Sequence, residues 1–312
     1  MGRVTCLAGG VGAARFLQGL VRVVPEEEVT VIVNTGDDIE LHGLHISPDV
    51  DIVTYTLANI VDEEKGWGVR GDTFRCLEIL KRYGYEAWFN LGDMDLATHI
   101  SRTRLLRDGL SLSEVADRHR RALGVKARIL PMTDDRFETR IKTEAGVMHF
   151  QEFLVKHGST DRVLGVYFEG AEKANPSPGV VESIESSDGI IICPSNPIVS
   201  VGTILSVGGV REALRETDAR VVGISPIVGG KPVRGPADKL MEGLGFEVSA
   251  YAVAELYKDF LDAFIIDRVD SSECGRIEGL GIKVTITNTV MKNMQDKISL
   301  ARSAIEALGK RG

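Results

Sequence analysis

Four aspartates near the N-terminus have a type and spacing that can bind a divalent cation. Asp37 and Asp38 end the segment VIVNTGDD, and Asp49 and Asp51 lie in SPDVD, about one helical turn into the following element. In a diphosphate site, Mg²⁺ takes one or two carboxylates together with phosphate oxygens and water. We therefore predict that Asp37 and Asp51 hold Mg²⁺ if their two loops converge. The structural alternatives are turn formation for Asp37 and helix N-capping for Asp49 or Asp51.

A glycine-rich loop precedes a helical pattern in CLAGGVGAARFLQGL, residues 6–20. Free backbone N–H groups and the helix dipole at such an N-terminus favour an anion, so Gly10 and Gly12 are predicted to bind a phosphate. Arg15 stands where a dinucleotide-binding loop has a small residue, and no Gly-Lys-Ser/Thr follows as in a P-loop. The Arg15 side chain either adds positive charge to the cleft or is a solvated helix residue.

Two later loops also follow apolar strand patterns. One, at 194–197, follows GIIIC, and the other, at 225–236, follows VVGI and carries Lys231 and Arg234. Both are rich in the residue types that any turn needs. In an open parallel sheet, however, ligands bind beyond the carboxyl ends of the strands. Together with the two loops above, these segments predict a ligand site along one edge of a sheet.

Strand and helix patterns alternate along the chain, which is typical of an α/β fold with a mainly parallel sheet and helices on both faces. Strand patterns occur at 3–8, 29–35, 127–132, 162–168, 188–194, 219–226, 263–269 and 282–289, and helix patterns at 13–24, 49–61, 72–84, 111–124 and 293–308. Ser111 and Glu114 form a predicted capping box. Alternating residues around 136–156 predict an antiparallel hairpin. We interpret residues 1–312 as one α/β unit with a helical insertion at about 48–125 and a hairpin insertion at about 132–160.

Composition excludes several classes of function. The chain carries 37 Lys and Arg against 45 Asp and Glu, a net charge of −8, which argues against broad binding to nucleic acid or an anionic membrane. Its four cysteines are far apart and form no CxxC pair, which fits a reducing cytosol. No apolar stretch reaches the length of a membrane span or of a signal sequence. We expect a cytoplasmic protein that binds neither nucleic acid nor membrane.

Some polar residues leave two interpretations open. Asp93 and Asp95, in LGDMD, belong either to the site or to its scaffold. His42, His45 and His99 could edge the cleft, but they lack the spacing of a zinc site, and single histidines are more often structural.

Longer motifs resemble one known family. They are LAGGVGAARFLQGL, VIVNTGDD, ISPDVDIVTYTLANI, LGDMDLATHI, ILPMTDDRFETRI, PSNPIVSVGTIL, SPIVGGKPVRGPADKLM and ITNTVMKN. In this order, and over nearly the whole chain, they resemble the 2-phospho-L-lactate transferases of coenzyme F-420 biosynthesis. The glycine loop alone is weak evidence, whereas PSNPIVSVGTIL and the SPIVGG…GPADKLM loop together are specific.

The resemblance implies a Rossmann-like core, a homodimer, a requirement for Mg²⁺ and a defined reaction. A 2-phospho-L-lactyl group, or in some members a phosphoenolpyruvyl group, passes from its guanosine diphosphate conjugate to the ribityl hydroxyl of the deazaflavin precursor Fo. The products are coenzyme F-420-0 and GMP. Charge neutralisation and in-line positioning are expected to dominate the catalysis of such a displacement.

The resemblance also implies roles for particular residues. Asp51 matches the family aspartate that contacts Fo, and Asn90 stands where the family has a basic Fo-binding residue. From their place beside proposed site loops, and not from the resemblance, Trp88 and Trp67 are candidates for stacking on a planar ligand, with burial in the core as the alternative. One of Asp37, Asp49 and Asp51 is expected to orient or deprotonate the attacking hydroxyl. We assign the guanosine diphosphate part to groups of the loops: Gly10, Gly12, Ser195, Asn196, Pro197, Gly229, Lys231 and Arg234.

Two alternatives are set against this prediction. A related family with a similar N-terminal loop binds nucleotide-sugars in a regulatory role, and it predicts binding of a UDP-sugar without binding of Fo. A nicotinamide-dependent dehydrogenase is disfavoured by Arg15 at the third glycine position.

Overall fold

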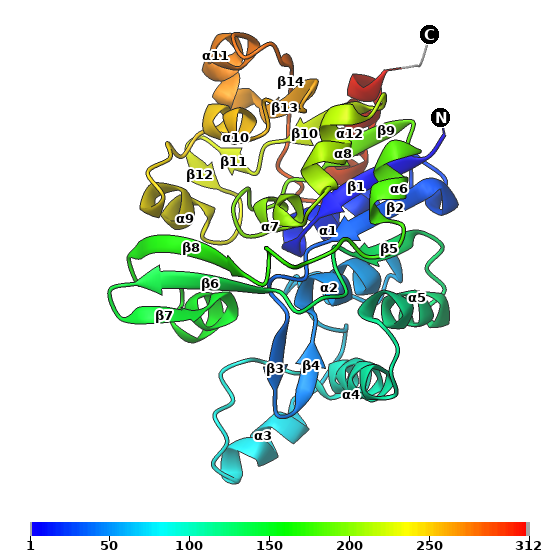
Figure 1. Cartoon of the computed structure of the whole chain (residues 1–312), viewed down its shortest axis with the longest axis vertical. Coiled ribbons are helices and arrows are strands. Elements are labelled where there is room, and N and C mark those ends of the chain that lie inside the picture. The colour runs from blue at the N-terminus through cyan, green and yellow to red at the C-terminus, as the bar shows by residue number, and fades with distance from the viewer. Residues whose placement is uncertain (1, 310–312) are drawn as a thin grey trace.

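A seven-stranded parallel sheet forms the centre of the protein, for which a computed structural model describes residues 2–309 (Figure 1). Its strand order is β14-β13-β10-β9-β1-β2-β5, and every neighbouring pair is parallel. The strands are β1 (Val4–Ala8), β2 (Val29–Val33), β5 (Arg128–Pro131), β9 (Gly189–Ile192), β10 (Arg220–Ile224), β13 (Ala263–Asp267) and β14 (Lys283–Thr287). The predicted α/β class and its mainly parallel sheet are confirmed.

Both faces of the sheet are buried under helices. Along β1, Cys6 contributes to one apolar cluster and Leu7 to the other, because successive side chains of a strand point to opposite faces. The Cys6 face is covered by α1 (Gly10–Leu20), α2 (Pro48–Leu57), α5 (Leu112–Ala122) and α12 (Met294–Leu308). The Leu7 face is covered by α6 (Val180–Glu185), α7 (Val201–Ser206), α8 (Val210–Glu216), α9 (Ala237–Gly243), α10 (Ala250–Leu256) and α11 (Cys274–Glu278). This two-sided cover explains why the central strands read as continuous apolar runs.

The segment between β2 and β5 contains a short hairpin of β3 (Ile39–Leu41) and β4 (Leu44–Ile46), then α2, α3 (Arg75–Arg82), α4 (Asp93–Arg107) and α5. The part of it formed by β3, β4, α3 and α4 extends away from the sheet (Figure 1). The predicted capping box at the start of α5 is confirmed, with Ser111 and Glu114 bonded reciprocally. Asp93 accepts hydrogen bonds from the backbone N–H groups of Arg75 and Cys76, so it anchors α3.

The predicted hairpin is confirmed, but one strand prediction is wrong. β6 (Glu138–Thr143) and β7 (Gly146–His149) pair antiparallel. β8 (Val163–Glu169), predicted as a strand of the buried parallel set, instead pairs antiparallel with β6 in a separate three-stranded sheet. One face of β8 is open, since Leu164 is 44% and Tyr167 50% exposed. A π-helical turn at Glu152–Lys156 follows β7.

The loop after β10 contains a small hairpin of its own, β11 (Ile227–Val228) and β12 (Lys231–Pro232). Its two-residue turn is Gly229-Gly230, with φ values of 59° and 72°. A turn with two positive φ angles favours glycine at both positions. Over residues 2–309, no helix combines the length and apolar character needed to cross a membrane.

Candidate active site

A cavity of about 450 Å³ lies at the carboxyl ends of the central strands. Its wall includes residues that follow β1, β2, β9, β10 and β14, so the four predicted loops converge and a fifth joins them. The wall also contains the first turns of α1 and α2. This edge of a doubly covered parallel sheet is where ligands bind in such folds.

The structure brings most of the predicted site residues to this cavity. Those that line it are Gly10, Gly12, Asp37, Asp49, Asp51, Asn90, Ser195, Asn196 and Arg234. Four others lie outside its lining. Trp88 packs edge-on against Phe89, Pro197 accepts a hydrogen bond from the N–H of Gly202, Gly229 donates its N–H to Asp270, and Lys231 is exposed on β12.

The glycine loop is compact because other chain segments press against it. The N–H of Gly9 donates to the Ser195 hydroxyl at 3.1 Å. A Cβ at Gly9 would lie 2.6 Å from Ser200 and 2.9 Å from an Asp49 oxygen, and one at Gly12 would collide with the carbonyl oxygen of Pro194. The glycines therefore let the β1 and β9 loops interlock. They also leave the N-terminus of α1, an 11-residue helix, at the cavity wall.

Asp37 and Asp49 form a buried acidic pair on the cavity wall. Asn34 donates to Asp49 at 3.0 Å, whereas Oδ1 of Asp37 is buried with no hydrogen-bond partner. Burial and the charge of Asp49 raise the pKa of Asp37 well above its ordinary value. Burial, reinforced by Asp38 and opposed by hydrogen bonds from Asn34 and from the backbone N–H of Gly10, raises the pKa of Asp49 to about 7. Two such carboxyl groups favour a bound cation, which would offset their charge.

Asp51 is held by a buried arginine. Nη1 of Arg102 donates to one Asp51 oxygen at 3.1 Å and Nη2 donates to the other. Arg102 lies on α4, is 2% exposed, and also donates from Nη1 to the backbone oxygen of His45 at 3.4 Å. Burial opposes its charge, but Asp51 raises its pKa. A two-point contact of this kind sets the direction of the carboxylate as well as its position.

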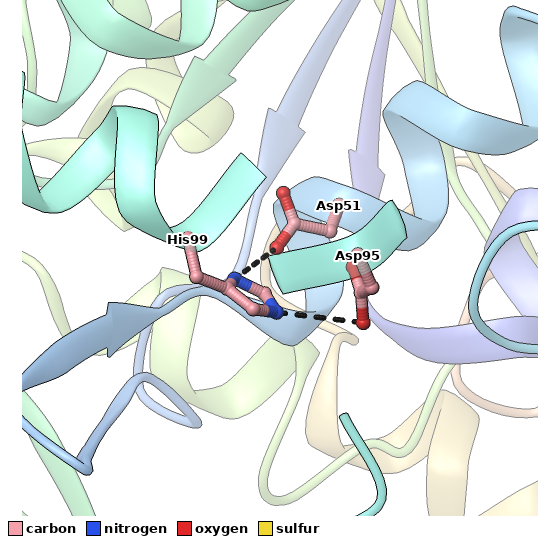
Figure 2. A group of neighbouring side chains, drawn as sticks. All are labelled: Asp51, Asp95 and His99. Atoms are coloured by element: carbon pink, nitrogen blue, oxygen red, sulfur yellow. Dashed lines mark ion pairs between the residues drawn. The ribbon is translucent and has the colours of Figure 1, made fainter. Parts of the chain in front are cut away.

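His99 extends this network towards a second aspartate (Figure 2). Its Nδ1 lies 3.7 Å from Asp51 and its Nε2 lies 3.4 Å from Asp95. The Tyr55 hydroxyl donates to Asp95 at 2.7 Å. One ligand atom from each of Asp51, Asp95 and His99 falls within 4.8 Å of the others, which is close enough to surround a metal ion. The adjacent Arg102 guanidinium, however, supplies positive charge to Asp51 already.

Comparisons with known proteins identify the family of this chain. The family model for 2-phospho-L-lactate transferase CofD matches residues 4–294. The chain belongs to the CofD family. It is 46% identical over 310 residues to the 2-phospho-L-lactate transferase of Methanocaldococcus jannaschii, which covers 98% of both chains. It is 45% identical over 310 residues to the phosphoenolpyruvate transferase of Streptomyces griseus, which covers 97% of this chain and 98% of that one.

A solved structure supports the fold of this CofD-family chain. The crystal structure of a member of the UPF0052 family from Bacillus halodurans superposes with a TM-score of 0.63. The match covers 97% of this chain and 98% of the other, at 15% sequence identity.

Several residues of this candidate site were missed or left open by the sequence. Arg102 was not predicted, and Asp95 and His99 were left between two interpretations. All three lie on α4, at spacings of four and three residues, so they share one face of the helix. That spacing is the one signal that could have linked them. Arg15, also left open, lines the cavity.

Proposed function

We propose that this chain transfers a phosphorylated three-carbon acid, 2-phospho-L-lactyl or phosphoenolpyruvyl, from its guanosine diphosphate conjugate to the ribityl hydroxyl of Fo, with release of GMP. One observation carries the proposal. A single cavity joins a helix N-terminus, suited to a diphosphate, to buried carboxylates suited to a cation and a hydroxyl group. Membership of the CofD family and relatives with both transferase names support it.

Three loops contribute groups that bind the donor. We assign the diphosphate to the backbone N–H groups of Gly10 and Gly12, where α1 begins. Ser195 and Asn196 flank this point from the β9 loop and line the same cavity. Arg234 supplies positive charge from the β10 loop.

A magnesium ion fits the acidic pair better than it fits Asp51. The unpartnered oxygen of Asp37 and the raised pKa values of Asp37 and Asp49 describe carboxyl groups that lack a positive partner. Both Asp51 oxygens already accept from Arg102. We therefore assign Mg²⁺ to Asp37 and Asp49. When bound, it would neutralise charge on the donor phosphates.

Asp51, which holds no metal ion in this assignment, is proposed to orient the acceptor. The Fo hydroxyl oxygen attacks the phosphorus that carries the three-carbon acid, and its proton passes to a carboxylate of the cluster Asp37, Asp49 and Asp51. The bond from that phosphorus to the bridging oxygen breaks, and its electron pair leaves on the phosphate of GMP. In-line displacement of this kind depends on positioning more than on covalent chemistry by the protein.

Direct assay of the transfer tests the proposal. Purified protein with Mg²⁺, Fo and the guanosine diphosphate conjugate should form GMP and the phosphodiester of Fo. Asp51→Asn should lower turnover by about 10²-fold, because the acceptor loses its orientation. Asp108→Asn, an exposed change at the end of α4, is the matched control. Binding of a UDP-sugar without binding of Fo would instead support the regulatory alternative.

Tryptophan fluorescence can locate the planar acceptor. Trp67 lines the cavity and is 36% exposed, whereas Trp88 does not line it. Fo, a planar aromatic ligand, should quench the emission of Trp67. We expect Trp67→Phe to remove most of the quenching and to weaken Fo binding by about 1 kcal/mol. Trp88→Phe should change neither. If Trp88→Phe instead removed the quenching, the Fo ring would be placed beside Trp88.

Two further expectations rest on the resemblance alone. We infer a homodimer, which sedimentation would detect as a particle of about twice the 33.9 kDa chain mass. We also infer a cytoplasmic location, which fractionation of the source cells would test.

A further inference from the structure

Two arginines from distant parts of the chain line the same cavity and are close enough for their charges to interact. Arg15 lies on α1 and Arg234 lies in the loop after β12, and both line the cavity. A Cβ at Gly66 would fall within 3.3 Å of both the Arg234 guanidinium carbon and the Val11 side chain. Val11 and Arg15 are four residues apart on α1, so they share one face of that helix.

Neither guanidinium has a carboxylate partner within 4 Å in the described part of the chain, residues 2–309. The hydrogen bond of Arg15 is a 3.4 Å contact from Nη1 to the backbone oxygen of Met291. Burial, and then the positive charge of Arg234, lower the pKa of Arg15, while the more distant charge of Glu63 opposes them. Two like charges that face one cavity are best offset by an anion bound between them.

Asp49 and Arg234 lie against different residues at the start of α1. Asp49 approaches Gly9 and Gly10, whereas Arg234 lies beside Val11 and Gly66. A phosphoryl group at the N-terminus of α1 would thus have carboxylates on one side and guanidinium groups on the other. In an in-line displacement, the attacking and leaving oxygens lie on opposite sides of the phosphorus.

We propose that Arg15 and Arg234 form an anion clamp that binds the departing phosphate of GMP and stabilises the charge it gains. The assignment of Arg15 rests on the proposed function and adds a residue that the family resemblance did not supply. As the bond to the bridging oxygen breaks, negative charge grows on the phosphate of GMP. Preorganised donors aimed at a developing charge stabilise the transition state more than the bound substrate.

The donor has a second anion that could occupy the clamp, the carboxylate of its three-carbon acid. That carboxylate is absent from GMP, and L-lactate carries it without a phosphate. Calorimetric titration of the full chain with each compound therefore separates the two sources. The variants are Arg15→Gln and Arg234→Gln, with Arg22→Gln as the matched control, since Arg22 is exposed just after α1.

We expect Arg15→Gln and Arg234→Gln each to weaken GMP binding at least about tenfold and to lower turnover about 10²-fold, with Arg22→Gln unchanged. The double variant should lose less than the product of the two single losses, because the arginines act on one group. Arg234 is exposed, so its variant tests the clamp even if Arg15→Gln folds poorly.

Three other results would contradict the clamp. Unchanged GMP affinity in both variants removes the departing phosphate as its ligand. A loss of L-lactate affinity alone assigns the pair to the carboxylate instead. An equal loss of GMP affinity in Arg22→Gln would show that the effect comes from the net charge of the protein and not from the clamp. The proposed function fails in a different way, since the wild-type protein would then bind neither GMP nor GDP.

Discussion

Arg102→Gln should lower turnover by about 10²-fold or more and destabilise the protein by about 3 to 5 kcal/mol. The substitution leaves the Asp51 carboxylate buried without its positive partner, which costs far more than the loss of an exposed ion pair. It also removes the two-point contact that directs Asp51 towards the acceptor. Urea unfolding gives the stability change, and steady-state assay of GMP release gives the change in turnover.

The same helix provides the control for this prediction. Arg104→Gln removes a guanidinium from α4 that is 83% exposed and pairs with the exposed Asp108. Its effect on stability should stay below about 1 kcal/mol. The double variant Arg102→Gln with Asp51→Asn should regain part of the stability but none of the activity, because the unpaired charge is gone while the acceptor contact is still missing. Normal turnover in Arg102→Gln would refute the role given to the pair.

Asp49→Asn should abolish most activity and yet make the metal-free protein more stable above pH 7. Burial raises the pKa of Asp49 from 3.8 to about 7, so the folded state holds this proton more tightly than the unfolded chain does. That stabilisation is complete below pH 3.8 and is lost as the pH rises through 7. At pH 8 the wild-type protein therefore bears a buried charge that costs about 2 to 4 kcal/mol, which the neutral asparagine avoids.

Thermal unfolding at two pH values, with and without Mg²⁺, checks this second prediction. Without metal, Asp49→Asn should unfold at a higher temperature than the wild type at pH 8 and at the same temperature near pH 4. Added Mg²⁺ should reduce the difference in unfolding temperature at pH 8. It offsets the buried charge in the wild type, whereas the variant offers it one carboxylate ligand fewer. Turnover should fall about 10²-fold. A variant that is less stable at pH 8 would show that Asp49 is already neutralised by the protein itself.

The sequence carried most of the information about the sheet. Continuous apolar runs identified the central parallel strands, since a strand buried on both faces has no polar alternation to obscure it. The loops that follow those strands predicted the place of the cavity, because ligands bind beyond the carboxyl ends of parallel strands. The β8 segment had an equally apolar pattern, but its position depends on pairing with β6 in a separate sheet, which no local signal specifies.

The network around Asp51 shows where local patterns stop being informative. Asp51 and Arg102 are 51 residues apart, and they meet because α2 and α4 fold against each other. Trp67 and Trp88 could not be distinguished by type or neighbourhood, yet only Trp67 is part of the cavity wall in the described chain. Residue types predicted which kinds of chemistry the chain could perform, while long-range packing decided which side chains come together at the cavity.

The interlocked β1 and β9 loops have a consequence for the kinetics of binding. Because Gly9 and Gly12 sit against residues nearly two hundred positions away, the glycine turn to which we assign the diphosphate is assembled when the sheet folds and need not be ordered by its ligand. A preorganised site loses little conformational entropy on binding. The nucleotide should therefore associate in a single fast step, without the slow isomerisation that follows binding when a mobile loop must close.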